Sequence, residues 1–158
     1  MASFKDLRQY QKVIIDFMAY TDILKVSDDE LAFITKKDNE YDAINYLFNL
    51  GIKYLIITRG KDGVTFIDKN RTLHQEGFKV KVKDTTGAGD SWIGAFLAQI
   101  ADVDVLDDYS DDQILEILNY ANAAAAITTT NIGAISALPS AFEVDSFIKK
   151  HNSKKHRN

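Results

Sequence analysis

The residues most suited to chemistry lie in the stretch KDTTGAGD, residues 83–90, which directly precedes a long apolar run. Gly87 and Gly89 flank one alanine, and the carboxylate of Asp90 follows them. A helix that begins here exposes unpaired backbone N–H groups and a partial positive charge at its first turn. Glycine lets the backbone approach an anion, because no Cβ stands in the way. The pattern therefore predicts a backbone cradle for a phosphate group beside one acidic side chain.

Asp90 fits two roles at this position. In the first turn of a helix it can cap the backbone or complement the helix dipole. As a general base, it can take a proton from an attacking hydroxyl while nearby amides hold the transferred phosphoryl group. The glycines favour the second role, since a cap does not require them, although they also fit a tight strand-to-helix turn. Two common glycine fingerprints fail: G-x-G-x-x-G is broken at Trp92, and Gly60-Lys61 is followed by aspartate rather than serine or threonine.

Several elements are expected to position this loop. Residues 7–18 have apolar side chains at helical spacing, and Ile23–Val26 has the pattern of a short strand. Ser27 and Glu30 form a capping box at the start of the next helix. Tyr54–Thr58 is a continuous β-rich run, typical of a strand buried on both faces. Further strands are expected at Val64–Ile67, Thr72–Gln75 and Phe78–Val82, and further helices at Tyr41–Leu50, Asp90–Ala101, Asp111–Thr128 and Ala141–Lys150.

This order of elements predicts an α/β layered domain with an antiparallel patch at one edge. Two parallel-type strands are few for a full α/β sheet, so one sheet edge is expected to stay open. The domain is expected to span residues 1–150. A basic tail at 151–158, with Lys154, Lys155 and Arg157, is expected to be disordered.

Composition narrows the classes of function. The 158 residues, 46% hydrophobic and 27% charged, suffice for a globular domain with a core. A net charge of −4 argues against a nucleic-acid partner, because phosphate binding needs a basic face. The absence of cysteine excludes disulfides and thiolate metal sites and fits a reducing compartment. No apolar run approaches the roughly 20 residues that cross a bilayer, so we expect a cytoplasmic protein without membrane partners.

Four blocks of the sequence, in order, resemble the pfkB, or ribokinase-like, family of carbohydrate kinases. They are TDILKVSDDELAFIT, YLIITRGKDGVTF, DTTGAGDSWIGAFLAQI and NYANAAAAITTTNIGAISALP. The first block is most similar in sequence to bacterial fructokinases. The resemblance implies a ribokinase-like, Rossmann-type layered sheet and ATP-dependent phosphorylation of a sugar hydroxyl, with fructose to fructose 6-phosphate as the expected reaction.

The same resemblance assigns roles around the glycine loop. Asp90 would be the catalytic base, and Gly87, Ala88 and Gly89 would form the anion hole for the transferred phosphoryl group. Nucleotide-binding positions would be Thr58, Gly60, Gly63 and Asn122. Two of these also have ordinary structural explanations: Gly63 fits a hairpin turn, and Asn122 fits a satisfied polar residue in an alanine-rich helix.

Cation sites are also implied by the resemblance. Asp84, Thr86 and a carbonyl of Gly133 would hold a monovalent ion such as K⁺, although Asp84 also fits a plain turn residue. Glu30 matches the glutamate of an Asn-x-x-Glu motif that orders Mg²⁺ through water. Ser27 replaces the asparagine of that motif here, and the capping box explains Glu30 equally well.

Members of the family are longer than this chain. Their N-terminal half carries a Gly-Gly-x-x-x-Asn helix start and a β-sheet lid, and neither pattern occurs here. The sequence therefore resembles the C-terminal part of such a kinase, without the lid domain. Three hypotheses stay open: a sugar kinase that binds ATP and a sugar, an inactive remnant that binds nucleotide, and a protein that self-associates, for example as a homodimer, through its open sheet edge.

Overall fold

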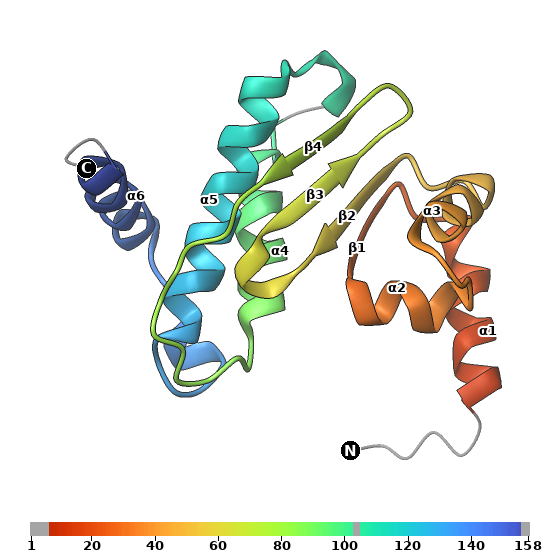
Figure 1. Cartoon of the computed structure of the whole chain (residues 1–158), viewed down its shortest axis with the longest axis horizontal. Coiled ribbons are helices and arrows are strands. Elements are labelled where there is room, and N and C mark those ends of the chain that lie inside the picture. Colours follow the sequence, from red (N-terminus) through yellow and green to blue (C-terminus); the bar gives the residue numbers. More distant parts are fainter. Residues whose placement is uncertain (1–6, 103–104, 156–158) are drawn as a thin grey trace. The chain divides into compact units, whose positions relative to one another are not determined.

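The computed structural model describes residues 7–102 and 105–155, with side chains described as far as residue 153 (Figure 1). This part of the chain divides into two compact units. The first unit holds the described residues up to Arg59 together with Thr65–Leu73. The second unit holds Gly60–Val64 and the described residues from His74 onward.

The first unit begins with a helix and alternates strands with helices. Its main core consists of aliphatic side chains from all of these elements, among them Met18, Leu47, Leu55 and Ile57. In chain order the elements are α1 (Leu7–Met18), β1 (Ile23–Ser27), α2 (Asp28–Thr35), α3 (Glu40–Asn49) and β2 (Tyr54–Thr58).

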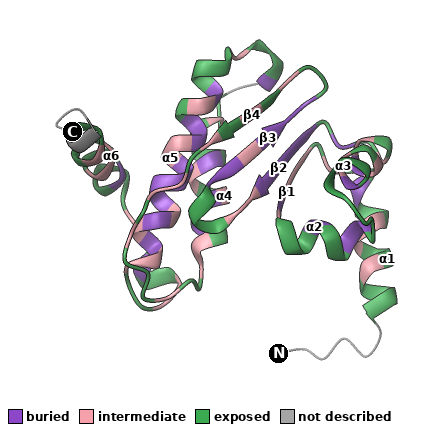
Figure 2. Cartoon of the chain, in the orientation of Figure 1, coloured by how far each residue is buried: buried purple, intermediate pink, exposed green. Residues whose placement is uncertain are grey.

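The sheet contains four strands in the order β1-β2-β3-β4, with β3 at Val64–Ile67 and β4 at Thr72–Gln75. Strands β1 and β2 are parallel, with Ile23 opposite Tyr54. The arrows in Figure 1 show that β3 runs against both β2 and β4, which confirms an α/β sheet with an antiparallel edge. Strand β2 is buried along most of its length, as its continuous apolar run predicted (Figure 2).

In the second unit, α4 (Ala88–Gln99) packs along α5 (Asp111–Thr129), and α6 (Ala141–Lys155) also contacts α5. Phe96 and Leu118 are fully buried here, as is Ala123 of the alanine run. Figure 2 shows buried segments along much of α5. Small side chains allow helices to approach closely, so packing accounts for the alanine run of α5.

One expected strand is absent, and two helices have bounds that differ from the expected ones by two residues or more. Phe78–Val82 forms no strand; instead Phe78 packs edge-on against Phe147 and His151 of α6, with ring centroids 5.0 and 5.3 Å away. Phe78 and Val80 of this loop are half-buried, whereas Val82 is exposed. Helix α4 begins two residues earlier than expected. Helix α6 continues to Lys155, through positions assigned to the basic tail, and residues 156–158 lie outside the described part.

Within the described residues, no helix combines the length and the apolar character that crossing a membrane requires.

Candidate functional site

The glycine loop turns the chain sharply into α4. Gly87 occupies the N-cap position in the left-handed region, with φ of +78°. A Cβ at this position would lie 3.0 Å from the Cα of Ala134, on the loop that follows α5. Both the backbone conformation and this close approach require glycine.

The first turn of α4 leaves part of its backbone unpaired. The amide of Ala88 donates to the carbonyl of Thr85 at 3.2 Å, and the amide of Ser91 donates to that of Gly87 at 2.8 Å. The amides of Gly89 and Asp90 find no acceptor among the described residues, and no side chain caps the helix. The open N–H groups are therefore those of Gly89 and Asp90, whereas the amide of Ala88, predicted to line the anion hole, is engaged.

Asp90 is exposed, and its carboxylate has no hydrogen bond or ion pair within the described part of the chain. It does not fold back onto the open amides beside it, so it does not act as a side-chain cap. A free carboxylate beside free N–H groups can accept a proton while those groups hold an anion.

Asp84 organises the start of the same loop. Its Oδ1 accepts from the amide of Thr86 at 2.9 Å and from the hydroxyl of Thr86 at 2.7 Å, and its Oδ2 accepts from the amide of Gly133 at 3.0 Å. The Thr86 amide, the Thr86 hydroxyl and the Gly133 amide, in that order, lower the pKa of Asp84 to about 2. The three residues predicted for a monovalent cation site therefore lie together, and Gly133 contributes an N–H group to their cluster.

Helix α5 holds this loop in place. The carbonyl of Thr129 accepts from the amides of Lys83 and Asp84 at 2.8 and 3.2 Å. Farther along the helix pair, the buried hydroxyls of Thr128 and Ser91 lie 2.9 Å apart. These bonds fix both the entry to the loop and the first turn of α4 relative to the end of α5.

Asn122 ties α5 to α4 and to the end of β4. Its Oδ1 accepts from the indole Nε1–H of Trp92 at 2.8 Å, and its Nδ2 lies 3.3 and 3.1 Å from the carbonyls of Gln75 and Glu76. Asn122 is buried, and both ends of its amide are engaged. The structural explanation of Asn122, a polar residue whose hydrogen bonds are satisfied within the fold, requires such partners, and the structure supplies them. Trp92 is buried as well, and the sequence analysis did not predict the polar bond of its indole.

The other predicted nucleotide positions differ in how much space surrounds them. Gly60, with φ of +54°, has open space where a Cβ would point. Gly63, with φ of +97°, packs against the backbone of Gln75 and Gly77, so a side chain there would collide with main-chain atoms. Gly63 therefore has a packing role, whereas Gly60 leaves its backbone accessible.

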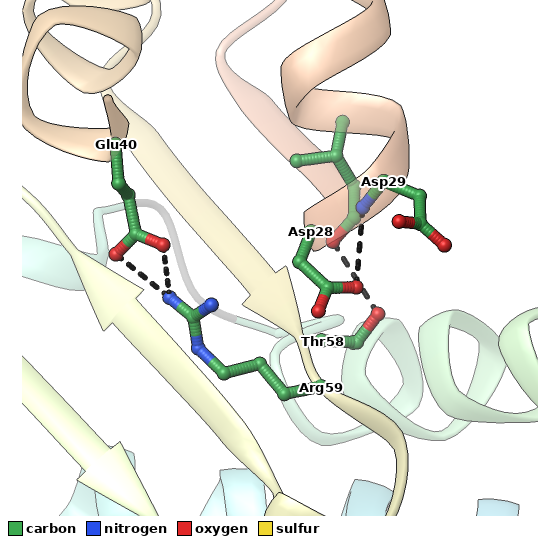
Figure 3. A network of polar contacts seen from close by, with 6 residues as sticks. Asp28, Asp29, Glu40, Thr58 and Arg59 are labelled. Atoms are coloured by element: carbon green, nitrogen blue, oxygen red, sulfur yellow. Dashed lines mark hydrogen bonds and ion pairs between the residues drawn. The ribbon is translucent and has the colours of Figure 1, made fainter. Parts of the chain in front are cut away.

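Thr58 belongs to the first unit, where its hydroxyl donates to the carbonyl of Val26 at 3.3 Å. The next residue, Arg59, reaches Glu40 at the start of α3, with its Nη2 2.8 and 2.7 Å from the two carboxylate oxygens (Figure 3). The sequence analysis did not predict this ion pair. Two charged residues so far apart in the chain give no local signal that they will meet.

Glu30, the residue predicted to order Mg²⁺, closes a capping box at the start of α2. Its Oε2 accepts from the amide of Ser27 at 2.8 Å, and the Ser27 hydroxyl accepts from the Glu30 amide at 3.1 Å. Across the described residues, no group of three or more histidine, aspartate or glutamate side chains could hold a metal ion.

The structure brings one group of predicted residues together within the second unit. The loop residues surround the first turn of α4 within the second unit, which also holds Gly60, Gly63 and Asn122. Glu30 and Thr58 lie in the first unit. The residues gathered at the loop are Asp84, Thr86, Gly87, Ala88, Gly89, Asp90 and Gly133.

Comparison with known proteins gives consistent matches. Residues 3–141 match the family described as pfkB family carbohydrate kinase. Fructokinase-2 of Zea mays is 38% identical over 141 residues, which is 88% of this chain and 42% of that protein. The chain therefore spans about two fifths of the length of this curated relative.

Solved structures of kinases also resemble this chain over most of its length and over less than half of their own. Fructokinase from Vibrio cholerae O395, with fructose, ADP and calcium ion bound, has a TM-score of 0.80 at 27% identity, covering 89% of this chain and 45% of that one. A double mutant of this enzyme with fructose, ADP and potassium ion gives 0.81 at 26%, covering 90% and 46%. Aminoimidazole riboside kinase from Salmonella enterica, complexed with aminoimidazole riboside and an ATP analog, gives 0.79 at 31%, covering 90% and 47%.

Proposed function

This chain belongs to the pfkB family of carbohydrate kinases, and from this premise we propose that it supplies the phosphoryl-transfer site of an ATP-dependent sugar kinase. The observation that carries the proposal is the open first turn of α4. The amides of Gly89 and Asp90 are unpaired there, and the carboxylate of Asp90 is free. This arrangement suits an anion and a proton acceptor side by side.

Asp90 would accept the proton of a sugar hydroxyl as the hydroxyl oxygen attacks the γ-phosphorus of ATP. The new P–O bond forms as the bond to the β-phosphate oxygen breaks, and ADP leaves with that oxygen. The Gly89 and Asp90 amides would hold the equatorial oxygens of the transferred group, where negative charge lies. Gly87 lets the loop pass close to Ala134, where a Cβ would lie 3.0 Å from the Cα of that residue.

The donor atoms around the loop fit the cations of this chemistry. The carboxylate of Asp84 and the hydroxyl of Thr86 are oxygen ligands, which suit K⁺, and Gly133 fixes the carboxylate. Mg²⁺ would be held mainly by the phosphates of the nucleotide, with Glu30 contributing through water. Bound there, Mg²⁺ neutralises charge on the phosphates.

We infer fructose as the sugar because a maize fructokinase and a Vibrio cholerae fructokinase lie among the relatives. Aminoimidazole riboside is the competing substrate class, supported by the Salmonella enterica kinase of comparable similarity. ATP and the sugar would be the small-molecule partners, and the cytoplasm would be the site of the reaction.

The open first turn of α4 also fits a second candidate. The unpaired amides of Gly89 and Asp90 can hold a phosphate group whether or not a sugar is bound. In that case the chain would be a nucleotide-binding protein without turnover.

Two measurements separate these candidates. A fluorescent ATP analogue titrated into the protein reports nucleotide binding, and a coupled assay reports ADP release with and without fructose. Sugar-dependent ADP release supports the kinase, and substituting aminoimidazole riboside for fructose tests the sugar. Nucleotide binding without sugar-dependent release supports the second candidate, and the absence of both signals overturns both.

A further inference from the structure

Helices α4 and α5 meet largely through small apolar side chains. Ala95 of α4 packs against the cluster that contains Ala123 and Ala124 of α5, and both of these α5 alanines are buried. Small side chains allow the two helix backbones to approach closely, but apolar contact has no preferred direction. Such contacts alone do not fix how far α4 is rotated about its own axis.

Two directional bonds join the same helices, and both lie directly after Asp90. The hydroxyls of Ser91 and Thr128 are 2.9 Å apart. The indole Nε1–H of Trp92 donates to the Oδ1 of Asn122 at 2.8 Å. Both residues of each pair are buried, so leaving either bond unmade would strand polar atoms away from water.

These bonds select one rotation of the first turn of α4. Advancing the helix by one residue would turn it by about 100° and break both of them. The open amides of Gly89 and Asp90 lie in the same helical turn as the two anchored positions. The direction of these amides relative to α5 therefore depends on the two buried bonds.

The side-chain amide of Asn122 is itself held from the other side. Its Nδ2 lies 3.3 and 3.1 Å from the carbonyls of Gln75 and Glu76, at the end of β4. An indole N–H can only donate and a main-chain carbonyl can only accept, so these partners permit one orientation of the amide. A nucleotide base would have to compete with them for a side chain that is buried.

The ring of Trp92 connects Asn122 to the first turn. It stacks on Phe96, one turn farther along α4, with ring centroids 5.3 Å apart and an interplanar angle of 14°. The stack and the bond to Asn122 hold the indole from two sides, and the residue is 3% exposed. Because Trp92 lies two residues after Asp90, a change in the position of this ring would strain the turn that carries the open amides.

We propose that Asn122 is a positioning residue that acts through Trp92 on the first turn of α4, and that it does not bind the nucleotide base. The inference rests on the proposed function, in which the amides of Gly89 and Asp90 hold a phosphoryl group. Asn122 then supports the binding of phosphate groups whether or not the ligand carries a base. A residue that reads adenine would affect only ligands that contain it.

A ligand without a base separates these two roles. Tripolyphosphate carries the phosphate chain alone, and a non-hydrolysable ATP analogue carries the base as well. Titration calorimetry should show that Asn122→Leu weakens the binding of both ligands by the same factor, about fivefold, the size of one buried hydrogen bond. Weaker binding of the ATP analogue alone would mean that Asn122 reads the base, and would overturn the proposal.

The dependence on Trp92 has a test of its own. Trp92→Phe removes the indole N–H and keeps an aromatic ring, and it should weaken tripolyphosphate binding about as much as Asn122→Leu does. In the double variant the loss should be smaller than the product of the two single factors, because both substitutions remove the same bond. Independent losses, or unchanged affinity in Trp92→Phe, would contradict an action through Trp92. Trp92→Phe also decides the question if Asn122→Leu does not fold.

The matched control is Asn119→Leu, the same substitution one turn earlier on α5. The Oδ1 of Asn119 lies 3.5 Å from the Nε2 of Gln75, and this side chain has no hydrogen bond to α4 within the described residues. Both affinities should stay at the parent values in this variant. Trp92 is the only tryptophan of the chain, so its fluorescence reports in each leucine variant whether this ring stays buried.

Failure of this inference and failure of the proposed function give different results. If the parent protein binds neither ligand, the proposed function fails, and the ligand-free protein then tests the positioning role. The amide resonances of Gly89 and Asp90 should shift in Asn122→Leu and stay in place in Asn119→Leu. Unchanged resonances in Asn122→Leu would overturn the proposal.

Discussion

The helices α2 and α4 both begin with acidic residues, yet their first turns are built differently. At α2, the hydroxyl of Ser27 and the carboxylate of Glu30 bond to each other's backbone amides. At α4, Gly87 stands at the cap, no side chain bonds to the helix, and two amides stay open. The first turn of α2 is closed by its own side chains, whereas that of α4 is available to a ligand.

Under the proposed function, this difference separates a structural use of acidic residues at α2 from a chemical use at α4. Carboxylates near a helix start are favourable at either helix because of the dipole, so their presence alone does not identify a site. Helix α4 differs in two respects. No side chain caps it, and Gly87 occupies a position that only glycine can adopt. Glu30 already has a structural partner, so any role with Mg²⁺ must coexist with its capping bond.

The largest expected effect concerns Asp90. In the form of the protein that turns over sugar, Asp90→Asn should lower kcat by roughly 10²–10⁴, the usual contribution of a general base. Asp29→Asn, an exposed acid in the first turn of α2, is the matched control and should leave kcat unchanged. Steady-state ADP release measures both. Equal kcat for Asp90→Asn and the parent would remove the functional distinction between the two helix starts.

The next effect concerns the backbone at Gly87. Gly87→Ala should lower the free energy of unfolding by about 1–2 kcal/mol, because alanine resists the left-handed conformation, with more lost through the contact with Ala134. Gly94→Ala, inside α4 with open space around it, should instead raise it by about 0.5–1 kcal/mol. Urea unfolding of both variants measures the contrast. A stable Gly87→Ala protein would show that the loop does not need its observed turn.

At α2 the expected effect is purely structural. Ser27→Ala removes the hydroxyl that caps the helix and should lower the free energy of unfolding by about 1 kcal/mol. Affinity for an ATP analogue should stay at the parent value, because the amides at α4 are untouched. Urea unfolding and a fluorescence titration on the same samples test the two halves of this prediction. Weakened nucleotide binding would mean that the closed helix start also takes part in the site.

Local sequence signals predicted much of the structure at these two helix starts and in the sheet. The Ser27–Glu30 capping box, strand β2 and the glycine loop were each readable from adjacent residues, because the bonds that form them span only a few positions. The ranges of β3 and β4 were also predicted correctly. Apolar alternation and turn residues are local, and they specify short antiparallel strands well.

The failures came from contacts between distant parts of the chain. Phe78–Val82 alternates as a strand would, but Phe78 packs against Phe147 of α6 and the segment pairs with no strand. The bond between Trp92 and Asn122 joins two helices through buried polar atoms, and neither residue signals it alone. The exposed apolar residues Val13 and Phe17 of α1 were likewise predicted only as part of a helical pattern, since such a pattern does not show which apolar side the fold will cover.

A smaller effect tests whether Gly89 is retained for chemistry. Glycine inside a helix is unfavourable, so Gly89→Ala should raise the free energy of unfolding by about 0.5–1 kcal/mol. The added Cβ would stand beside the open amides, and affinity for an ATP analogue should fall. Urea unfolding and nucleotide titration measure the two changes. If stability and affinity rose together, the small residue at this position would have no role in admitting an anion.

The smallest effect is the acid sensitivity of the loop. The Thr86 amide and hydroxyl and the Gly133 amide hold the pKa of Asp84 at about 2, below its ordinary value of 3.8. Because the folded-state pKa is lowered, the bonds that Asp84 accepts are intact above about pH 4 and are lost as the pH falls through about 2. The amide resonances of Thr86 and Gly133 should therefore shift together in that window, and Asp84→Asn should abolish the shared shift. The first turn of α2, which Asp84 does not touch, should keep its Glu30 amide resonance through the Asp84→Asn substitution. If the resonances of Thr86 and Gly133 moved at different pH values, Asp84 would not be what joins the glycine loop to the loop after α5.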